Sequence, residues 1–348
     1  MGDIRVKKKR QRKSKFPLFF VGFVVLLGIA AGAAYHFELY TYLPLFSGFS
    51  KEYALYDDVG NALGGLLSQT QAEIKSWPAV YVVERDRDVA PLPKAENYDE
   101  NFTSYSDETI TVKYYTEKYS YSHIHYLDVR IAHPSQIRLG LCGNEFDMKK
   151  RDYPSEIAKS VNAVAAIDGC FYNNRSSGWM IYQGNLLRTT CCWYDVLLID
   201  ADGNLHAQRD LTIDESGILE QYDIVNALTF GPQLVKDGKA KYITVGTWQP
   251  YTPEPRAAIC QFPDGLHYLL CVAEGRMGRS RGLTMQQFAN LLASKGVDFA
   301  YNLDGGQSGT LILGNHVKNV VAYGGQRRLG DILYFATAME NDEASEAQ

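Results

Sequence analysis

The stretch YNLDGGQSGTLIL, residues 301–313, places an aspartate and two glycines between two apolar runs. Tyr, Leu and Ile favour β-strands, and Asp-Gly and Gly-Gly sequences favour tight turns between strands. The stretch therefore predicts a strand, a turn and a second strand, and Asp304 could simply bond to the backbone of that turn. Glycine also lets a ligand approach the backbone closely, so the same turn could instead form part of a binding site.

Two other predicted strands also end in an acidic residue followed by glycine. They are AAIDGCF, which contains Asp168, and CVAEGRM, which contains Glu274. One such strand end is most often a turn. Three of them, each followed by polar residues, indicate that three carboxylates gather in one pocket.

Predicted strands dominate the chain from residue 109 onward. β-Branched and aromatic residues alternate in 109–131, and shorter apolar runs follow at 163–168, 195–200, 267–274, 298–304 and 331–337. A helix is predicted at 284–296, because Thr284 and Gln287 form a capping box and Gly296 ends the pattern. We therefore predict an α+β domain at 109–340, with a mixed sheet core and a few flanking helices.

The N-terminus predicts a membrane anchor. Residues 16–35 carry no charged side chain and would rise about 30 Å as a helix, the thickness of a bilayer core. Residues 1–15 are basic, so the positive-inside rule places them in the cytoplasm and the domain outside it. We expect an uncleaved transmembrane signal-anchor at 16–36; a signal peptide cleaved near Ala31-Gly32-Ala33 is the alternative.

The charge outside this tail is strongly acidic. Residues 1–15 hold eight of the 35 Lys and Arg residues and one of the 40 acidic residues, so 27 basic and 39 acidic residues remain. Such a balance argues against a nucleic-acid-binding surface. Residues 37–108 predict a stalk and linker, and residues 341–348 an acidic tail.

The six cysteines include no C-x-x-C pair, so a structural zinc site is not predicted. Outside the cytoplasm they could form disulfides or serve as apolar strand residues, and the sequence leaves both open. We predict no metal and no cofactor. The open alternative is a Ca²⁺ or Mg²⁺ site made by Asp168, Glu274 and Asp304, because carboxylate oxygens suit these ions.

Five ordered blocks extend these observations. They are VNAVAAIDGCFYN (161–173), FGPQLVKDGK (230–239), EPRAAICQFPDG (254–265), EGRMGRSRGLTMQQFANLLASKGVDFAYNLDGGQSGTLIL (274–313) and GGQRRLGDILYF (324–335). In this order they resemble the phosphodiester glycosidase family, over about residues 109–340. That family includes a lysosomal enzyme that removes N-acetylglucosamine from a phosphodiester on mannose, and bacterial exported proteins associated with exopolysaccharide.

The resemblance implies roles for individual residues. Cleavage of a glycosyl phosphate needs a carboxylate for the sugar carbon or for water, and arginines can hold the phosphate. Asp304 is the implied catalytic carboxylate, with Glu274 or Asp168 as its partner. The implied substrate- and phosphate-binding residues are Arg256, Arg327, Arg276, Gly305, Gly306, Ser308 and Gln233. Asp304 as a turn residue and Arg256 as a buried ion-pair partner remain the structural alternatives.

The blocks also depart from the family pattern. IDGC replaces the usual I-N-G-G, so Asp168 stands for Asn and Cys170 for Gly, and Glu274 stands for the Asp of D-G-R. The sequence predicts a membrane-anchored extracytoplasmic hydrolase that cleaves a glycosyl phosphodiester in a cell-envelope or exported glycopolymer. Because of these departures, the alternative is a catalytically altered module of the same fold that binds a glycan or phosphopolymer.

Overall fold

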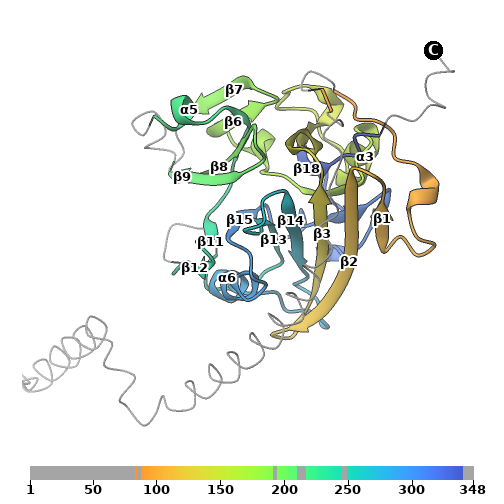
Figure 1. Cartoon of the computed structure of the whole chain (residues 1–348). Helices are drawn as coiled ribbons and strands as arrows, with labels where there is room; N and C mark the ends of the chain where they lie inside the picture. Colours follow the sequence, from red (N-terminus) through yellow and green to blue (C-terminus); the bar gives the residue numbers. More distant parts are fainter. Residues whose placement is uncertain (1–82, 85–87, 191–193, 210–216, 244–248, 340–348) are drawn as a thin grey trace, which may run out of the picture. The chain divides into compact units, whose positions relative to one another are not determined.

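The fold in Figure 1 is that of a computed structural model, which describes residues 83–84, 88–190, 194–209, 217–243 and 249–339. The predicted cytoplasmic tail, the signal-anchor at 16–36 and the acidic tail lie outside these ranges. Among the helices within them, none is long and apolar enough to cross a membrane.

The strands form three sheets. The first has the order β1-β2-β3-β14-β13-β15-β11-β12, the second β7-β6-β10-β8-β9, and the third β17-β16-β5-β18-β4. The first sheet consists of β1 (Ser104–Ser106), β2 (Ile110–Tyr119), β3 (Ser122–Ile131), β11 (Gln233–Lys236), β12 (Lys239–Ala240), β13 (Arg256–Gln261), β14 (His267–Ala273) and β15 (Phe299–Leu303). The second consists of β6 (Gly178–Tyr182), β7 (Asn185–Thr190), β8 (Asp195–Asp200), β9 (Leu205–Arg209) and β10 (Ile224–Thr229). The third consists of β4 (Ile137–Leu141), β5 (Ala165–Asp168), β16 (Leu311–Leu313), β17 (His316–Val317) and β18 (Asp331–Phe335).

Helices are few and short. The α-helices are α3 (Pro154–Ser160), α5 (Ile218–Gln221) and α6 (Met285–Ala293), and the 3₁₀ turns are η3 (Ala95–Asn97), η4 (Pro134–Gln136), η5 (Cys142–Asn144), η6 (Tyr172–Asn174) and η8 (Ala322–Gly324). A mostly β structure with a few helices is consistent with the predicted α+β class. The predicted mixed sheet was wrong, because every pairing between the described strands is antiparallel. Short turns join neighbours such as β2 and β3, whereas parallel neighbours need long crossover connections.

Helix α6 begins where the sequence predicts. The Thr284 side chain accepts a hydrogen bond from the Gln287 backbone N–H, and the Gln287 side chain accepts one from the Thr284 N–H. Its apolar face, which includes Phe288 and Leu292, packs with Cys260 and Cys271 of the first sheet. The helix therefore covers one face of that sheet (Figure 1).

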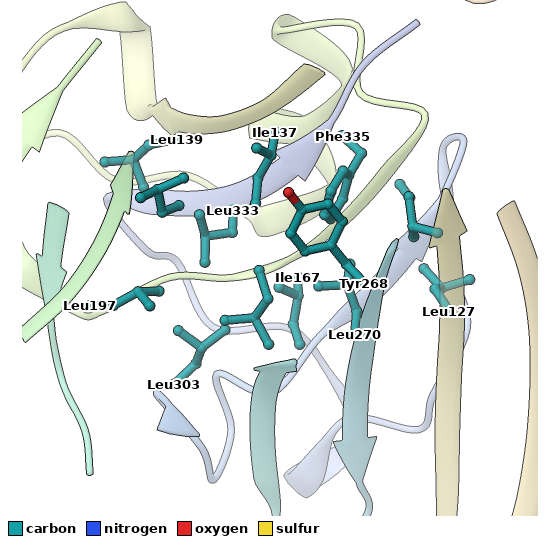
Figure 2. Packing of buried hydrophobic residues seen from close by; sticks show 14 of the residues in the cluster. Leu127, Ile137, Leu139, Ile167, Leu197, Tyr268, Leu270, Leu303, Leu333 and Phe335 are labelled. Carbon is teal, nitrogen blue, oxygen red and sulfur yellow. The ribbon is translucent and has the colours of Figure 1, made fainter. Parts of the chain in front are cut away.

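The other face of the first sheet packs against the remaining two sheets. Figure 2 shows this core, in which Leu270 and Leu303 of the first sheet and Leu197 of the second belong to one cluster of buried residues. Ile167 and Leu333 of the third sheet belong to the same cluster. One apolar core thus holds the three sheets together, and it fixes where their strand ends lie.

The described part of the predicted stalk and linker also packs on this domain. Tyr105 of β1 is 1% exposed, and Ala90 donates a backbone hydrogen bond to Val161. Of the six cysteines, the four that the structure describes, Cys142, Cys170, Cys260 and Cys271, are free thiols.

Candidate functional site

Two of the predicted strand ends meet directly. Asp304 follows β15 of the first sheet, and its backbone N–H donates to the carbonyl of Gly169, which follows β5 of the third sheet. The Thr310 N–H, beyond the turn, donates to Asp168 Oδ1 at 3.0 Å. The two acid–Gly motifs are therefore joined by hydrogen bonds on both sides of the 304–308 turn.

A third aspartate, Asp331, joins this pair at the first residue of β18. Its Oδ2 accepts a hydrogen bond from the Cys170 N–H at 2.8 Å. The pattern of acids at strand ends does not select Asp331, because it begins a strand. β18 runs antiparallel to β5, with Ile332 opposite Asp168, so the start of one strand lies beside the end of the other. The sequence feature that could have identified Asp331 is the Gly330-Asp331 pair in the last family-like block.

The three carboxyl groups are buried to different degrees. Asp168 and Asp331 are fully buried, and Asp304 is 8% exposed. Burial and the nearby charge of Asp304 raise the pKa of Asp168 well above its usual value, and burial raises the pKa of Asp331 to about 6. Asp168 Oδ2 and Asp331 Oδ1 have no hydrogen-bond partner among the described residues. Both acids are therefore held in surroundings that favour the neutral form.

Arg327 is the cation at Asp304. Its Nη2 donates to Asp304 Oδ2 at 2.6 Å and also contacts Ser308 Oγ, and its guanidinium lies 4.2 Å from the centre of the Phe171 ring. Burial raises the pKa of Asp304, while Arg327 and a hydrogen bond with Ser308 act in the opposite direction. The Arg327 side chain is 35% exposed. This places a guanidinium and a carboxylate side by side within reach of solvent.

Glu274 lies at the end of β14 but is bonded elsewhere. Its Oε1 is 3.0 Å from His125 Nε2 and accepts from the Val320 N–H, while Ser280 Oγ lies 3.1 Å from Oε2. Burial lowers the pKa of His125, so the neutral imidazole is favoured there. Glu274 therefore has partners of its own, and none of these bonds joins it to Asp168, Asp304 or Asp331.

Arg256 is buried and turned towards the backbone. Its Nε donates to the Leu283 carbonyl, and its Nη2 donates to the carbonyls of Gln249 and Thr252. Burial lowers its pKa to about 10. These bonds fix the loop before β13 to the start of α6.

That loop supports the two glycines of the turn. The Gly306 N–H donates to the Pro255 carbonyl, so this amide already has a partner. A Cβ on Gly305 would lie only 2.4 Å from the same oxygen. Glycine is required at 305 for this close contact between the two loops.

The remaining predicted residues differ in their distance from the turn. Arg276 borders it, because a Cβ on Gly306 would be 3.1 Å from Arg276 Nη1, and Arg276 Nε donates to Glu254. Gln233 pairs with Tyr301 on β15, three residues before Asp304, which corresponds to about 10 Å along a strand. It lines a separate cavity of about 570 Å³ together with residues such as Phe299. Gln233 is therefore not at the Asp304 turn.

Within the described parts of the chain, no three His, Cys, Asp or Glu side chains are grouped in a way that could hold a metal ion. The Asp168–Glu274–Asp304 metal alternative therefore has no support from the arrangement of these side chains. Glu274 is the member that lies apart.

Comparisons with known proteins agree with the fold. Residues 161–336, about half of the chain, match the phosphodiester glycosidase family. The structure is similar to the zebrafish N-acetylglucosamine-1-phosphodiester alpha-N-acetylglucosaminidase catalytic domain, auto-inhibited by its pro-peptide, with a TM-score of 0.52 and 18% identity over 71% of this chain and 87% of that one. A hypothetical protein from Synechocystis gives a TM-score of 0.48 and 16% identity over 65% and 62% of the two chains. No curated protein matches the sequence.

Proposed function

The chain belongs to the phosphodiester glycosidase family, and on that premise we propose that it hydrolyses a glycosyl phosphodiester at Asp304 and Arg327. The observation that carries this proposal is the 2.6 Å contact between Arg327 Nη2 and Asp304 Oδ2. A guanidinium suits the phosphate group and a carboxylate suits the sugar carbon or its water.

The bond that breaks joins the anomeric carbon to a phosphate oxygen. The phosphate monoester leaves with the electron pair and needs little protonation, because it is a weak base. Arg327 neutralises the charge on the leaving phosphate. Asp304 accepts the proton of the water that adds to the anomeric carbon. Asp304, the least buried of the three aspartates, is therefore sufficient as the carboxylate for the chemistry.

The other acids have supporting roles in this scheme. Asp168 and Asp331 are fully buried, which supports a role in holding the 304–308 turn and the segment after β5. The bonds of Glu274 to His125 and Ser280 support a structural role for the loop after β14. We propose that no cofactor is needed, so a chelator should not change the rate.

The decisive test measures release of reducing sugar from a glycosyl phosphodiester by the full-length protein. Asp304→Asn should lower kcat roughly 10²–10⁴-fold, the range for a positioned base. Asp298→Asn is the matched control, because Asp298 is an exposed aspartate that immediately precedes β15. Unchanged turnover in Asp304→Asn would contradict the assignment. Substrate binding without turnover in the wild type would favour the binding-module alternative.

We further propose that the substrate is an extracytoplasmic glycopolymer and that residues 16–36 anchor the enzyme. Two arginine–tyrosine pairs support a polymer, one beside the turn and one at the loop between β2 and β3. Arg276 lies 5.6 Å from the Tyr323 ring centre and Arg281 lies 5.4 Å from that of Tyr121. The two tyrosines are 71% and 80% exposed. Exposed rings beside cations suit sugars that carry phosphate.

The polymer proposal has its own test. Tyr323→Ala should weaken hydrolysis of a phosphate-linked glycan polymer more than that of a single sugar phosphodiester, because only the polymer reaches beyond the scissile bond. The comparison is kcat/KM for the two substrates. Equal effects on both would contradict a polymer-binding role for this ring.

A further inference from the structure

The segment after β5 carries a second guanidinium close to the site. The Arg175 Cζ lies 5.0 Å from the centre of the Tyr194 ring and 4.8 Å from that of Phe230. These two contacts restrict the plane of the guanidinium. Its Nη1 is buried and has no hydrogen-bond partner among the described residues. A buried cationic donor without an acceptor is unfavourable, so this atom needs a ligand.

The contacts of this segment connect Arg175 to the strand that leads into the Asp304 turn. Phe230 N–H donates to the Tyr301 hydroxyl on β15, and the next residue, Gly231, donates to Asn302. The ring that packs on Arg175 is thus fastened to the strand that leads into Asp304. The charge of Arg175 also acts to lower the pKa of Asp304, as expected for a nearby cation.

Arg327 resembles Arg175, because it too packs on an aromatic ring and has a buried nitrogen without a described acceptor. Its Nε is buried and has no hydrogen-bond partner in the described parts of the chain, although its Nη2 bonds Asp304 and its guanidinium packs on Phe171. Phe171 and Arg175 belong to one short segment, with η6 between them. Two guanidiniums near one accessible carboxylate therefore each keep a donor without an acceptor. An anionic group with several oxygens is the chemistry that satisfies both donors.

We propose that Arg175 is a second anion-binding residue of this site, and that with Arg327 it holds the phosphate of the substrate. The identity of the substrate rests on the proposed function, whereas the binding of an anion by Arg175 does not. The pair makes the site select a phosphate leaving group over a neutral one. Lysine cannot replace Arg175 fully, because an ammonium lacks the planar fork that lies between two rings.

The first experiment compares two substrates of the same sugar with the full-length protein. Arg175→Gln should lower kcat/KM for the glycosyl phosphodiester about 10- to 100-fold, as expected when a bond to a charged group is lost. Its effect on an uncharged aryl glycoside should be small. Arg175→Lys should lie between wild type and Arg175→Gln. An equal loss on both substrates, or no loss on the phosphodiester, would overturn the proposal.

The second experiment measures binding of inorganic phosphate by calorimetry and needs no turnover. Wild type should bind phosphate, and Arg175→Gln should weaken that binding. Arg328→Gln is the control, because Arg328 packs on Tyr153 and its side chain is 60% exposed. Phosphate binding that depends on Arg175 in a protein without glycosidase activity would support the anion site and reject the proposed function. Hydrolysis of the phosphodiester at a rate that Arg175→Gln does not change would support the proposed function and reject the anion site.

Melting temperatures separate these effects from misfolding. If Arg175→Gln does not fold, Arg175→Lys carries the test, because it keeps the charge and the length of the side chain. Absence of phosphate binding by the folded wild type, together with indifference of the phosphodiester rate to Arg175→Lys, would overturn the proposal.

Discussion

Asp304 and Asp331 are both buried aspartates, but their surroundings differ in one respect. Arg327 bonds Asp304, and its charge acts against the effect of burial on the pKa. Burial raises the pKa of Asp331 more than its hydrogen bonds with Cys170 and Phe171 lower it, and Asp331 has no ion pair among the described residues. A single guanidinium therefore distinguishes a carboxylate suited to chemistry from one suited to structure.

The raised pKa of Asp331 predicts a pH dependence of stability. The folded-state pKa of about 6 exceeds the usual aspartate pKa of 3.8, so the folded state binds this proton more tightly. Asp331 therefore favours folding least above pH 6, and its contribution falls by about 2 kcal/mol as pH rises from 4 to 7. Asp331→Asn removes this dependence. Relative to wild type, the variant should gain stability over that window.

Urea unfolding of both proteins from pH 4 to pH 7 measures this gain. The difference between the two free energies of unfolding cancels the titration of groups that do not interact with Asp331, whereas Asp168, whose pKa Asp331 helps to raise, still contributes. Cys170 N–H can still donate to the Asn oxygen, so the backbone bond is retained. A difference that stays constant with pH would contradict the raised pKa.

At the scale of the elements, the 304–308 turn depends on the loop that Arg256 holds. Gly305 and Gly306 lie against Pro255, and Arg256 bonds three backbone carbonyls around it. Arg256 thus acts on the turn through the loop. A motif comparison could suggest that this arginine matters, but it could not tell a phosphate ligand from a residue that positions a loop.

The close contact at Gly305 predicts the effect of a single methyl group. Gly305→Ala would bring its Cβ to 2.4 Å from the Pro255 carbonyl oxygen, so the two loops must separate. We expect a loss of about 2 kcal/mol or more in the free energy of unfolding, with a lower kcat. Gly325→Ala is the control, because its Cβ would meet no atom within 4 Å and its φ of −170° suits any residue. Equal stability of the two variants would show that the turn can move freely.

At the scale of the whole molecule, one core joins three antiparallel sheets. Residues from all three sheets, such as Leu303, Ile167 and Leu197, share one apolar cluster (Figure 2). This shared core brings the end of β15 and the end of β5 together. Substitutions in it should therefore disturb the site even when they lie on strands that carry no functional residue.

The proposed anchor predicts where the whole protein is found. Full-length protein should remain with membranes after alkaline extraction, whereas a chain without residues 1–36 should not, because a span of 20 apolar residues inserts stably. Protease added to intact cells should reach the domain if it lies outside. Extraction of the full-length protein by alkali, or protection of the domain, would contradict the proposed topology.

The sequence by itself determined several of the strands, the start of α6 and the choice of Asp304 as a candidate, because these depend on local patterns. The apolar alternation, the capping box of Thr284 and Gln287, and the Asp-Gly-Gly turn each lie within a few neighbouring residues. The family-like blocks also predicted the family correctly.

Only the tertiary structure decided which side chains meet. Antiparallel pairing brought Asp331 to Asp168, internal hydrogen bonds occupied Glu274 and Arg256, and packing placed Arg175 between two rings near Asp304. Each of these contacts joins residues that are far apart in the sequence. Burial and hydrogen-bond partners depend on how the sheets pack. The local pattern that specifies a strand does not specify which residues will contact the end of that strand.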